Sequence, residues 1–113
     1  MASRRSGVGA PARNVEVTYF LSPAAEEELV EAVAFYREQA SSSIAAAFVS
    51  EFARAARLIA LNPGLGTPTS RGRRLFPLHR FPYSLLYRAD DEGVRISAVA
   101  HQRRRPGYWR TRP

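Results

Sequence analysis

The 113-residue sequence is long enough for one folded domain, and its formal net charge is +7. It lacks cysteine, which excludes disulfides and thiolate metal sites, and its two histidines, His79 and His101, would need carboxylate partners to hold zinc. No apolar run approaches the length of about 20 residues that spans a bilayer, and neither a G-x-S-x-G nucleophile elbow nor a P-loop is present.

The first thirteen residues are small, polar and turn-rich, and their three arginines give the segment a charge of +3. We predict that residues 1–13 form a disordered basic arm, because they have too little apolar surface to pack. Such an arm could touch nucleic acid, or it could be a loose start to the chain. The apolar core of a signal peptide is missing from it. We therefore expect one folded domain at residues 14–113.

The folded domain is predicted to begin with a strand and a helix. Residues 15–21 have the alternating pattern of apolar side chains that is typical of a strand, and they are rich in β-branched and aromatic residues. Ser22 then provides an N-cap, with Pro23 at the first helical position. Apolar residues at helical spacing predict a helix of about 17 residues: Ala25, Leu29, Ala32, Val33, Tyr36 and Ala40. Its glutamates should form an acidic outer face, with the first of them at the positive end of the helix dipole.

A second helix is predicted after a short serine turn. Residues 41–43 interrupt the first helix and cap the next one. The new apolar stripe consists of Ile44, Phe48, Phe52, Ala55 and Ile59. The helix should end at residues 62–64, because Pro63 removes a donor and disfavours helix before it. Two helices joined by a short polar turn should pack as an antiparallel hairpin. Residues 14–52, which include this hairpin, have a charge of −6.

Three β-type runs are predicted after a loop at residues 63–72. The runs cover residues 73–79, 83–88 and 94–101, and residues 90–93 form a tight turn between the last two. Strict alternation places Val94, Ile96, Ala98 and Ala100 on one face of the last strand, and Arg95, Ser97, Val99 and His101 on the other. A tail of twelve residues, 102–113, follows.

The order β-α-α-β-β-β predicts an α+β fold. We expect the helical hairpin to pack on one face of a small, mainly antiparallel sheet. The other face of the sheet would stay open and would carry Arg95 and His101.

The second half of the chain is strongly basic. Residues 53–113 have a charge of +10, and every basic residue of the chain is an arginine. The use of arginine in place of lysine suits phosphate and carboxylate partners. Coding bias in a GC-rich genome would also produce it. The candidate binding residues are Arg73, Arg74, Arg80, Arg95, His101, Arg103, Arg104, Arg105, Tyr108, Trp109 and Arg110. They could bind nucleic acid, with aromatic rings stacking on bases, or an acidic protein surface.

Structural alternatives exist for the non-arginine members of this set. His101 could hydrogen-bond the backbone at a strand end. Tyr108 and Trp109 could belong to a tail that folds back to cover the sheet edge. A Ser84–His101 pair lacks an acid that would orient the histidine. Acidic residues 90–92 read as a solvated turn more readily than as a metal or acid–base site. We expect neither a metal nor a cofactor.

Three segments resemble a known family: LSPAAEEEL at residues 21–29, RFPYSLLY at 80–87 and ISAVAHQRRRPGYW at 96–109. Together they look like the ParE branch of the RelE/ParE toxins, which belong to type II toxin–antitoxin and plasmid-stabilisation systems. The resemblance runs from about Val15 to Trp109. It implies a single RelE/ParE-like domain in which a helical hairpin lies on a small antiparallel sheet. It also implies a cytoplasmic toxin in a hetero-oligomer with an acidic antitoxin, whose C-terminal segment would wrap the basic half.

The resemblance implies one of two activities. ParE-like members inhibit DNA gyrase, whereas RelE-like members cleave mRNA on the ribosome without metal. The RelE-like pattern has an arginine after the central-strand tyrosine, and here Ser84 follows Tyr83, which favours gyrase inhibition. The alternatives are a ribosome-dependent endonuclease that uses His101, Arg103 and Tyr108, and an inactive homologue that only binds antitoxin.

Eight residues are predicted to contact the target or the antitoxin. They are Arg73, Arg74, Arg80, Arg95, His101, Arg103, Arg104 and Trp109.

Overall fold

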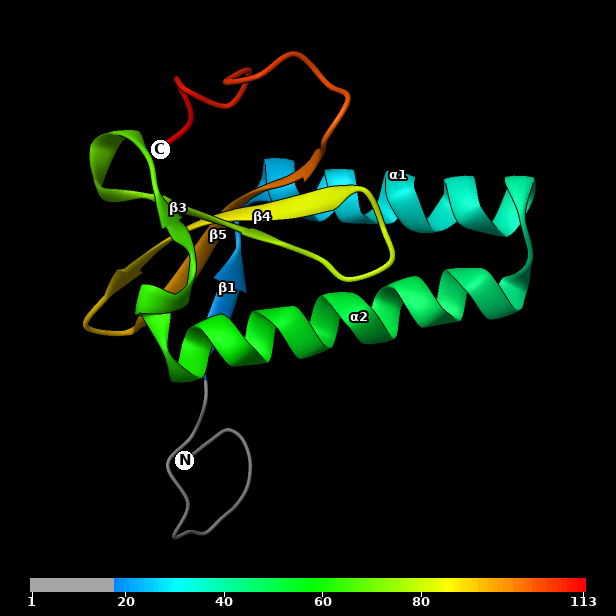
Figure 1. Ribbon diagram of the computed structural model, residues 1–113, viewed down its shortest axis with the longest axis horizontal. Coiled ribbons are helices and arrows are strands. Elements are labelled where there is room, and N and C mark those ends of the chain that lie inside the picture. Colours follow the sequence, from blue (N-terminus) through cyan, green and yellow to red (C-terminus); the bar gives the residue numbers. More distant parts are fainter. Residues whose placement is uncertain (1–17) are drawn as a thin grey trace, which may run out of the picture.

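A helical hairpin lies against one face of a five-stranded sheet in the computed structural model, which describes residues 18–113 (Figure 1). The predicted arm at residues 1–13 and the first residues of the predicted first strand lie outside this range. The helices are α1 (Pro23–Gln39) and α2 (Ser42–Leu61). The strands are β1 (Tyr19–Leu21), β2 (Thr67–Pro68), β3 (Arg74–Pro77), β4 (Tyr83–Asp90) and β5 (Gly93–His101).

The sheet has the order β1-β5-β4-β3-β2, and only β1 and β5 run parallel. The predicted α+β class and the mainly antiparallel sheet are therefore confirmed. The predicted loop at 63–72 is more structured than expected. It holds two short 3-10 turns and the edge strand β2, which pairs with β3. Pro68 has no backbone N–H to donate, which suits this position at the sheet edge.

Both helices start where the sequence predicts. The Ser22 Oγ accepts a hydrogen bond from the Ala25 N–H at 3.1 Å, and the Ser41 Oγ accepts one from the Ile44 N–H at 3.1 Å. Each serine thus satisfies one of the free donors of a first helical turn. None of the helices between residues 18 and 113 is long and apolar enough to span a membrane.

Aromatic rings dominate the core between the hairpin and the sheet. Tyr36, Phe48, Phe81 and Tyr83 meet mostly edge to face, with neighbouring ring centroids 5.2–6.3 Å apart. This edge-to-face packing adds about 0.5–1.5 kcal/mol per pair to the burial of the rings. Apolar side chains of β4 and β5 complete the core.

A β-bulge in β5 changes which residues share a face. Leu86 pairs with Ala98 and Tyr87 pairs with Ile96, so Ser97 is an extra residue without an opposite partner. The alternation therefore shifts by one at Ser97. Val94 and Ile96 face the helices with Val99, whereas Ala98 and Ala100 face away. The prediction that Val94, Ile96, Ala98 and Ala100 share one face is wrong for this reason.

The same bulge moves His101. Its strand partner is Tyr83, which lies in the core on the helix side, so His101 lies on that side and not on the open face as predicted. Arg95 precedes the bulge and does lie on the face away from the helices. Its guanidinium carbon is 5.0 Å from the centre of the Phe20 ring, and Phe20 projects from β1 on that face.

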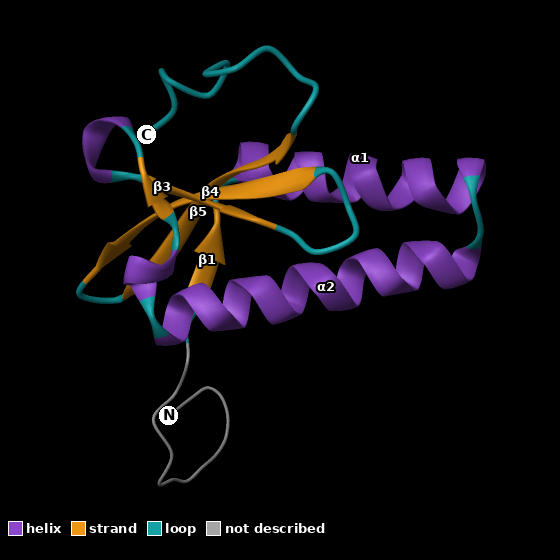
Figure 2. Ribbon diagram, viewed as in Figure 1, coloured by secondary structure: helices purple, strands orange, loops and turns teal. Residues whose placement is uncertain are grey.

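The second face of the sheet is partly covered and not fully open. The tail, residues 102–113, folds back across it as a series of turns without helix or strand (Figure 2). Trp109 is buried there against Leu86, Ala98 and Ala100. The tail does fold back, as the alternative interpretation of Tyr108 and Trp109 predicts, but it covers a face of the central strands β4 and β5 and not the sheet edge.

Candidate partner-binding site

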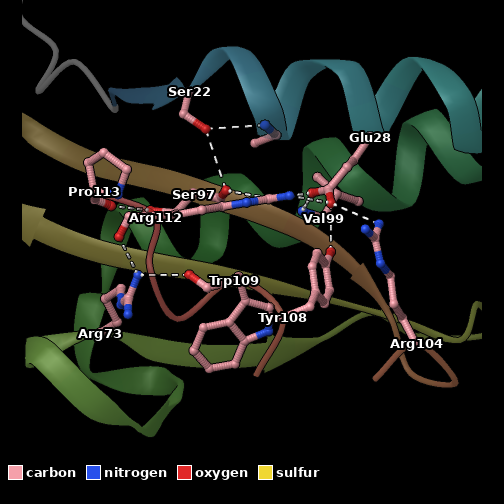
Figure 3. Close-up of polar contacts among 11 residues, drawn as sticks. Ser22, Glu28, Arg73, Ser97, Val99, Arg104, Tyr108, Trp109, Arg112 and Pro113 are labelled. Atoms are coloured by element: carbon pink, nitrogen blue, oxygen red, sulfur yellow. Dashed lines mark hydrogen bonds and ion pairs between the residues drawn. The ribbon is translucent and has the colours of Figure 1, made fainter. Parts of the chain in front are cut away.

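A buried glutamate from α1 holds the tail. Glu28 exposes only 9% of its surface, although the sequence pattern placed it on the acidic outer face. Its Oε1 accepts hydrogen bonds from the Val99 N–H and the Arg112 Nη1, both at 2.9 Å (Figure 3). Its Oε2 accepts from the Tyr108 Oη at 2.6 Å and from the Arg112 Nη2 at 3.0 Å. Arg104 adds a longer ion pair at 3.5 Å. We call Glu28, Arg104, Tyr108 and Arg112 the Glu28 cluster.

The hydrogen bonds keep this carboxylate ionised. Burial is the largest single influence and raises the pKa of Glu28, but the hydrogen bonds from Arg112, Tyr108 and the Val99 N–H together outweigh it, so the net pKa is lowered. The pKa of the Tyr108 phenol is raised, first by burial and then by its hydrogen bond to Glu28. Tyr108 therefore stays protonated and serves as a donor to Glu28.

The β-bulge supplies a further anchor for the tail. Because Ser97 has no opposite residue in β4, its carbonyl accepts from side chains, namely from the Arg112 Nη1 at 3.1 Å and the Ser22 Oγ at 3.4 Å. The Ser97 Oγ donates to the backbone oxygen of Pro113 at 3.3 Å. One irregular residue in the sheet thus connects the start of α1 to the end of the tail (Figure 3).

Arg73 is buried under the same tail. It exposes 1% of its surface, and its guanidinium donates to the carbonyls of Arg110 at 3.0 Å and Arg112 at 2.9 Å. It also lies over the Trp109 ring at 5.4 Å. Burial lowers the pKa of Arg73, and the nearby Arg71 and Arg88 lower it further. In this conformation Arg73 and Trp109 hold the tail in place and offer little surface to a partner.

Two other predicted arginines have partners inside the chain. Arg95 pairs with Asp90 at 2.5 Å and with Glu92 at 2.7 Å across the tight turn. Arg74 donates to the Gly66 carbonyl at 2.8 Å and stabilises the turn before β2. The acidic turn is exposed, as the sequence predicts, and two of its carboxylates also neutralise Arg95.

The three arginines that remain among the eight predicted contact residues come from neighbouring segments at one end of the sheet. The Gln102 N–H donates to the Pro82 carbonyl at 2.8 Å, which places the start of the tail beside the loop at residues 78–82. Exposed Arg80 comes from that loop and exposed Arg103 from the tail. Neither pairs with an acid within the described part of the chain. Arg104, next to them, stacks on the Tyr108 ring at 3.8 Å.

The three residues predicted for an endonuclease have different hydrogen-bond partners. The His101 Nδ1 accepts a hydrogen bond from the Arg103 N–H at 3.0 Å, so these two are adjacent. Tyr108 instead directs its hydroxyl to Glu28. Over residues 18–113 no three His, Asp or Glu side chains gather closely enough to hold a metal ion.

The sequence interpretation missed Glu28, Ser97 and Arg112. A signal for Glu28 was available, because it lies three residues after Ala25 and four before Ala32, on the buried stripe of α1. Ser97 and Arg112 had no such signal. Their roles depend on a bulge and on a return of the tail, and both are long-range features.

Comparisons with known proteins agree with this architecture. The family model described as the ParE toxin of the type II toxin–antitoxin system parDE matches residues 19–106. Among solved structures, a chain of the chromosomal ParDE toxin–antitoxin system from P. aeruginosa superposes with a TM-score of 0.66 at 19% identity, covering 75% of this chain and 95% of that one. At this identity the likeness establishes the fold. No curated protein matches the chain. Because the family model covers most of the sequence, the chain belongs to the ParE toxin family of type II toxin–antitoxin systems.

Proposed function

We propose that this ParE-family chain inhibits DNA gyrase in the cytoplasm and is neutralised there by an acidic antitoxin in a toxin–antitoxin hetero-oligomer. The main support for a binding target is the pair of arginines Arg80 and Arg103. Both are exposed at one end of the sheet, and neither is neutralised by an acid of the described chain. Unpaired guanidinium groups favour a carboxylate-bearing or phosphate-bearing partner.

The state of Tyr108 supports gyrase over the ribosome as the target. A metal-independent endonuclease needs a group that takes a proton from the attacking hydroxyl. Tyr108 is poorly suited, because its pKa is raised and its hydroxyl is bound to Glu28. Ser84, which stands where the RelE-like pattern has an arginine, points the same way.

Supercoiling of relaxed plasmid by purified gyrase tests the target. We expect wild-type chain at micromolar concentration to inhibit the reaction, and Arg103→Ala to need about tenfold more protein, which corresponds to a loss of about 1.4 kcal/mol of binding. Arg57→Ala is the matched control, because Arg57 is an exposed arginine on the outer face of α2. Unchanged supercoiling with folded wild-type chain would contradict the proposal.

The antitoxin is tested in the same assay. The product of the reading frame next to this gene, added in equimolar amount, should restore supercoiling. Because opposite charges drive the association, its affinity for the chain should weaken as salt rises. A neighbouring product that binds but leaves gyrase inhibited would overturn the neutralisation half of the proposal.

A further inference from the structure

A second group of arginines lies on the face of the sheet that points away from the helices. Arg88 of β4 stands directly opposite Arg95 of β5. Both side chains project from this face, because the residues beside them in each strand belong to the core on the helix side. Arg73 extends the row, since it immediately precedes the β3 residue that pairs with Tyr87. The row lies near the end of β4 and the start of β5, at the opposite end of these strands from the arginine pair of the proposed function.

The positive charge of this row is only partly neutralised. Arg95 pairs with the acidic turn, whereas Arg71 and Arg88 are exposed and form no ion pair within residues 18–113. Both lie close enough to buried Arg73 to lower its pKa by charge repulsion. Like charges directly opposite each other in a sheet are destabilising. The charge of Arg88 therefore does not stabilise the fold, and an anion at this position would relieve the repulsion.

A small cavity opens beside Arg88 at the edge of the same surface. Its volume is about 260 Å³, and Arg74, Arg88, two glycines and the ring of Tyr87 are among the residues that line it. None of its described lining residues is acidic. Gly72 leaves its rim open, because a Cβ there would meet no atom within 4 Å. A phosphate group in this cavity would meet two guanidinium groups and no carboxylate.

The chemistry of this surface favours a nucleic acid over a protein partner. Protein interfaces are centred on apolar or aromatic anchors that fill pockets. The large rings at this site are already covered, since Trp109 exposes 7% of its surface and Tyr87 exposes 1%. The ring of Phe20 lies under the guanidinium of Arg95. The site therefore offers a partner mainly arginine, which is typical of protein–DNA interfaces.

The lack of a free ring at this site also favours a duplex over a single strand. Proteins hold single strands largely by stacking bases on aromatic side chains. A duplex instead presents its phosphates outward, with one charge about every 3.4 Å along each strand. Arginines on neighbouring β-strands start about 4.8 Å apart, so several of them can contact one duplex at once.

We propose that this face binds the phosphate backbone of duplex DNA, with Arg71 and Arg88 in direct contact with phosphates and Arg74 lining the cavity that one phosphate enters. Such contacts do not read bases, so the chain should bind duplexes of any sequence. The site is separate from Arg80 and Arg103, and the inference does not depend on the proposed function. A chain that binds a protein target through those two arginines would keep this face available for DNA.

Fluorescence anisotropy of a labelled mixed-sequence duplex, titrated with the full chain at several salt concentrations and without gyrase, tests the proposal. The affinity of wild type should fall steeply as salt rises. Arg88→Thr should bind about three- to tenfold more weakly, and its slope of log affinity against log salt should be smaller by about one. Adding Arg71→Ala to this variant should lower the slope by about one more. Arg57→Ala removes the same charge from the exposed face of α2 and should keep the wild-type slope.

Unfolding in urea separates an effect on DNA binding from an effect on the fold. Threonine suits a strand and removes the charge that faces Arg95. The urea midpoint of Arg88→Thr should therefore be no lower than that of wild type. A variant that binds DNA weakly because it is unfolded would instead show a lower midpoint, and would show that Arg88 serves the fold.

Three results in the binding assay would overturn the proposal. They are a wild-type chain that leaves the duplex free at low salt, an Arg88→Thr variant with the wild-type slope, and an Arg57→Ala variant that weakens binding as much as Arg88→Thr. Tighter binding of a single strand would reject the duplex, and displacement of the duplex by poly-glutamate of similar charge would favour an acidic protein surface. Gyrase inhibition is scored separately, so duplex binding by a chain that leaves gyrase active retains this site and rejects the proposed target.

Discussion

At the scale of single residues, Glu28 determines how the second half of the chain is held. Its carboxylate receives hydrogen bonds from three tail side chains and from one strand N–H, and burial alone would disfavour its charge. The tail has no helix or strand of its own to stabilise it. The position of the tail therefore depends on this one side chain of α1 together with Arg73, the contacts of Ser97 and the burial of Trp109.

Glu28→Gln should weaken the contacts that hold the tail against the sheet. The amide keeps the size of the carboxyl group but loses its charge, and it leaves Arg112 without a counter-ion. We expect the free energy of unfolding in urea to fall by about 2–3 kcal/mol. Glu27→Gln, an exposed neighbour on the same helix, should change it by less than about 0.5 kcal/mol. Equal effects of the two substitutions would show that Glu28 does not hold the tail.

The pH dependence of stability should carry the signature of the same residue. Because the pKa of Glu28 is lower in the folded chain than its unfolded value of about 4.3, its contribution is complete above that value and is lost as the pH falls through the folded pKa. Glu51 contributes in the same direction, since Arg54 and the His79 N–H lower its pKa. Urea titrations from about pH 6 to pH 3 should therefore show a steep acid loss in wild type and a shallower one in Glu28→Gln. Parallel curves would contradict this assignment.

At the scale of elements, the sequence predicted the helix boundaries, because interactions between residues close in the chain determine them. Ser22, Ser41 and Pro63 set the helix boundaries through capping and a missing donor, and these effects act within one turn. The bulge at Ser97 was not predictable, because it depends on how β5 aligns with β4. One extra residue there reversed the faces of Ala98, Ala100 and His101.

The turn before β2 depends on a close backbone approach at Gly66. A Cβ at this position would lie 2.7 Å from the Tyr87 Oη and 2.9 Å from the Leu75 carbonyl oxygen. It would disrupt the hydrogen bonds that Tyr87 makes with the Gly66 N–H and the Pro63 carbonyl. We expect Gly66→Ala to lower the midpoint of urea unfolding, with a loss of about 2–4 kcal/mol.

Gly64→Ala is the control for this prediction. Its nearest contact, at 3.7 Å, is an ordinary one. Gly64→Ala should therefore lower the free energy of unfolding by less than about 0.5 kcal/mol. A Gly66→Ala variant as stable as Gly64→Ala would show that the turn relaxes without cost.

At the scale of the whole molecule, the charges are divided between an acidic and a basic half much as the sequence indicated. The difference is that one glutamate of the acidic half is buried. Glu28 turns inward and compensates Arg112, whereas Arg80 and Arg103 stay exposed and have no acidic partner among residues 18–113. Composition predicted a basic surface. It could not show which arginines have intramolecular partners, because Arg73, Arg74 and Arg95 meet their partners only in the folded chain.

The tail is also where family membership predicts least. The family match ends at residue 106, before Tyr108, Trp109 and Arg112. The residues that complete the Glu28 cluster and cover the sheet thus lie beyond the matched region. Their arrangement follows from this chain's own contacts.

The topology of a reporter plasmid in cells that express the chain shows whether the chain inhibits gyrase in vivo. If the chain inhibits gyrase, plasmid extracted after induction should shift to relaxed topoisomers on a chloroquine gel, and co-induction of the neighbouring reading frame should restore negative supercoiling. Arrested growth with normal supercoiling and codon-positioned cuts in translated mRNA would contradict the account and would place the target on the ribosome.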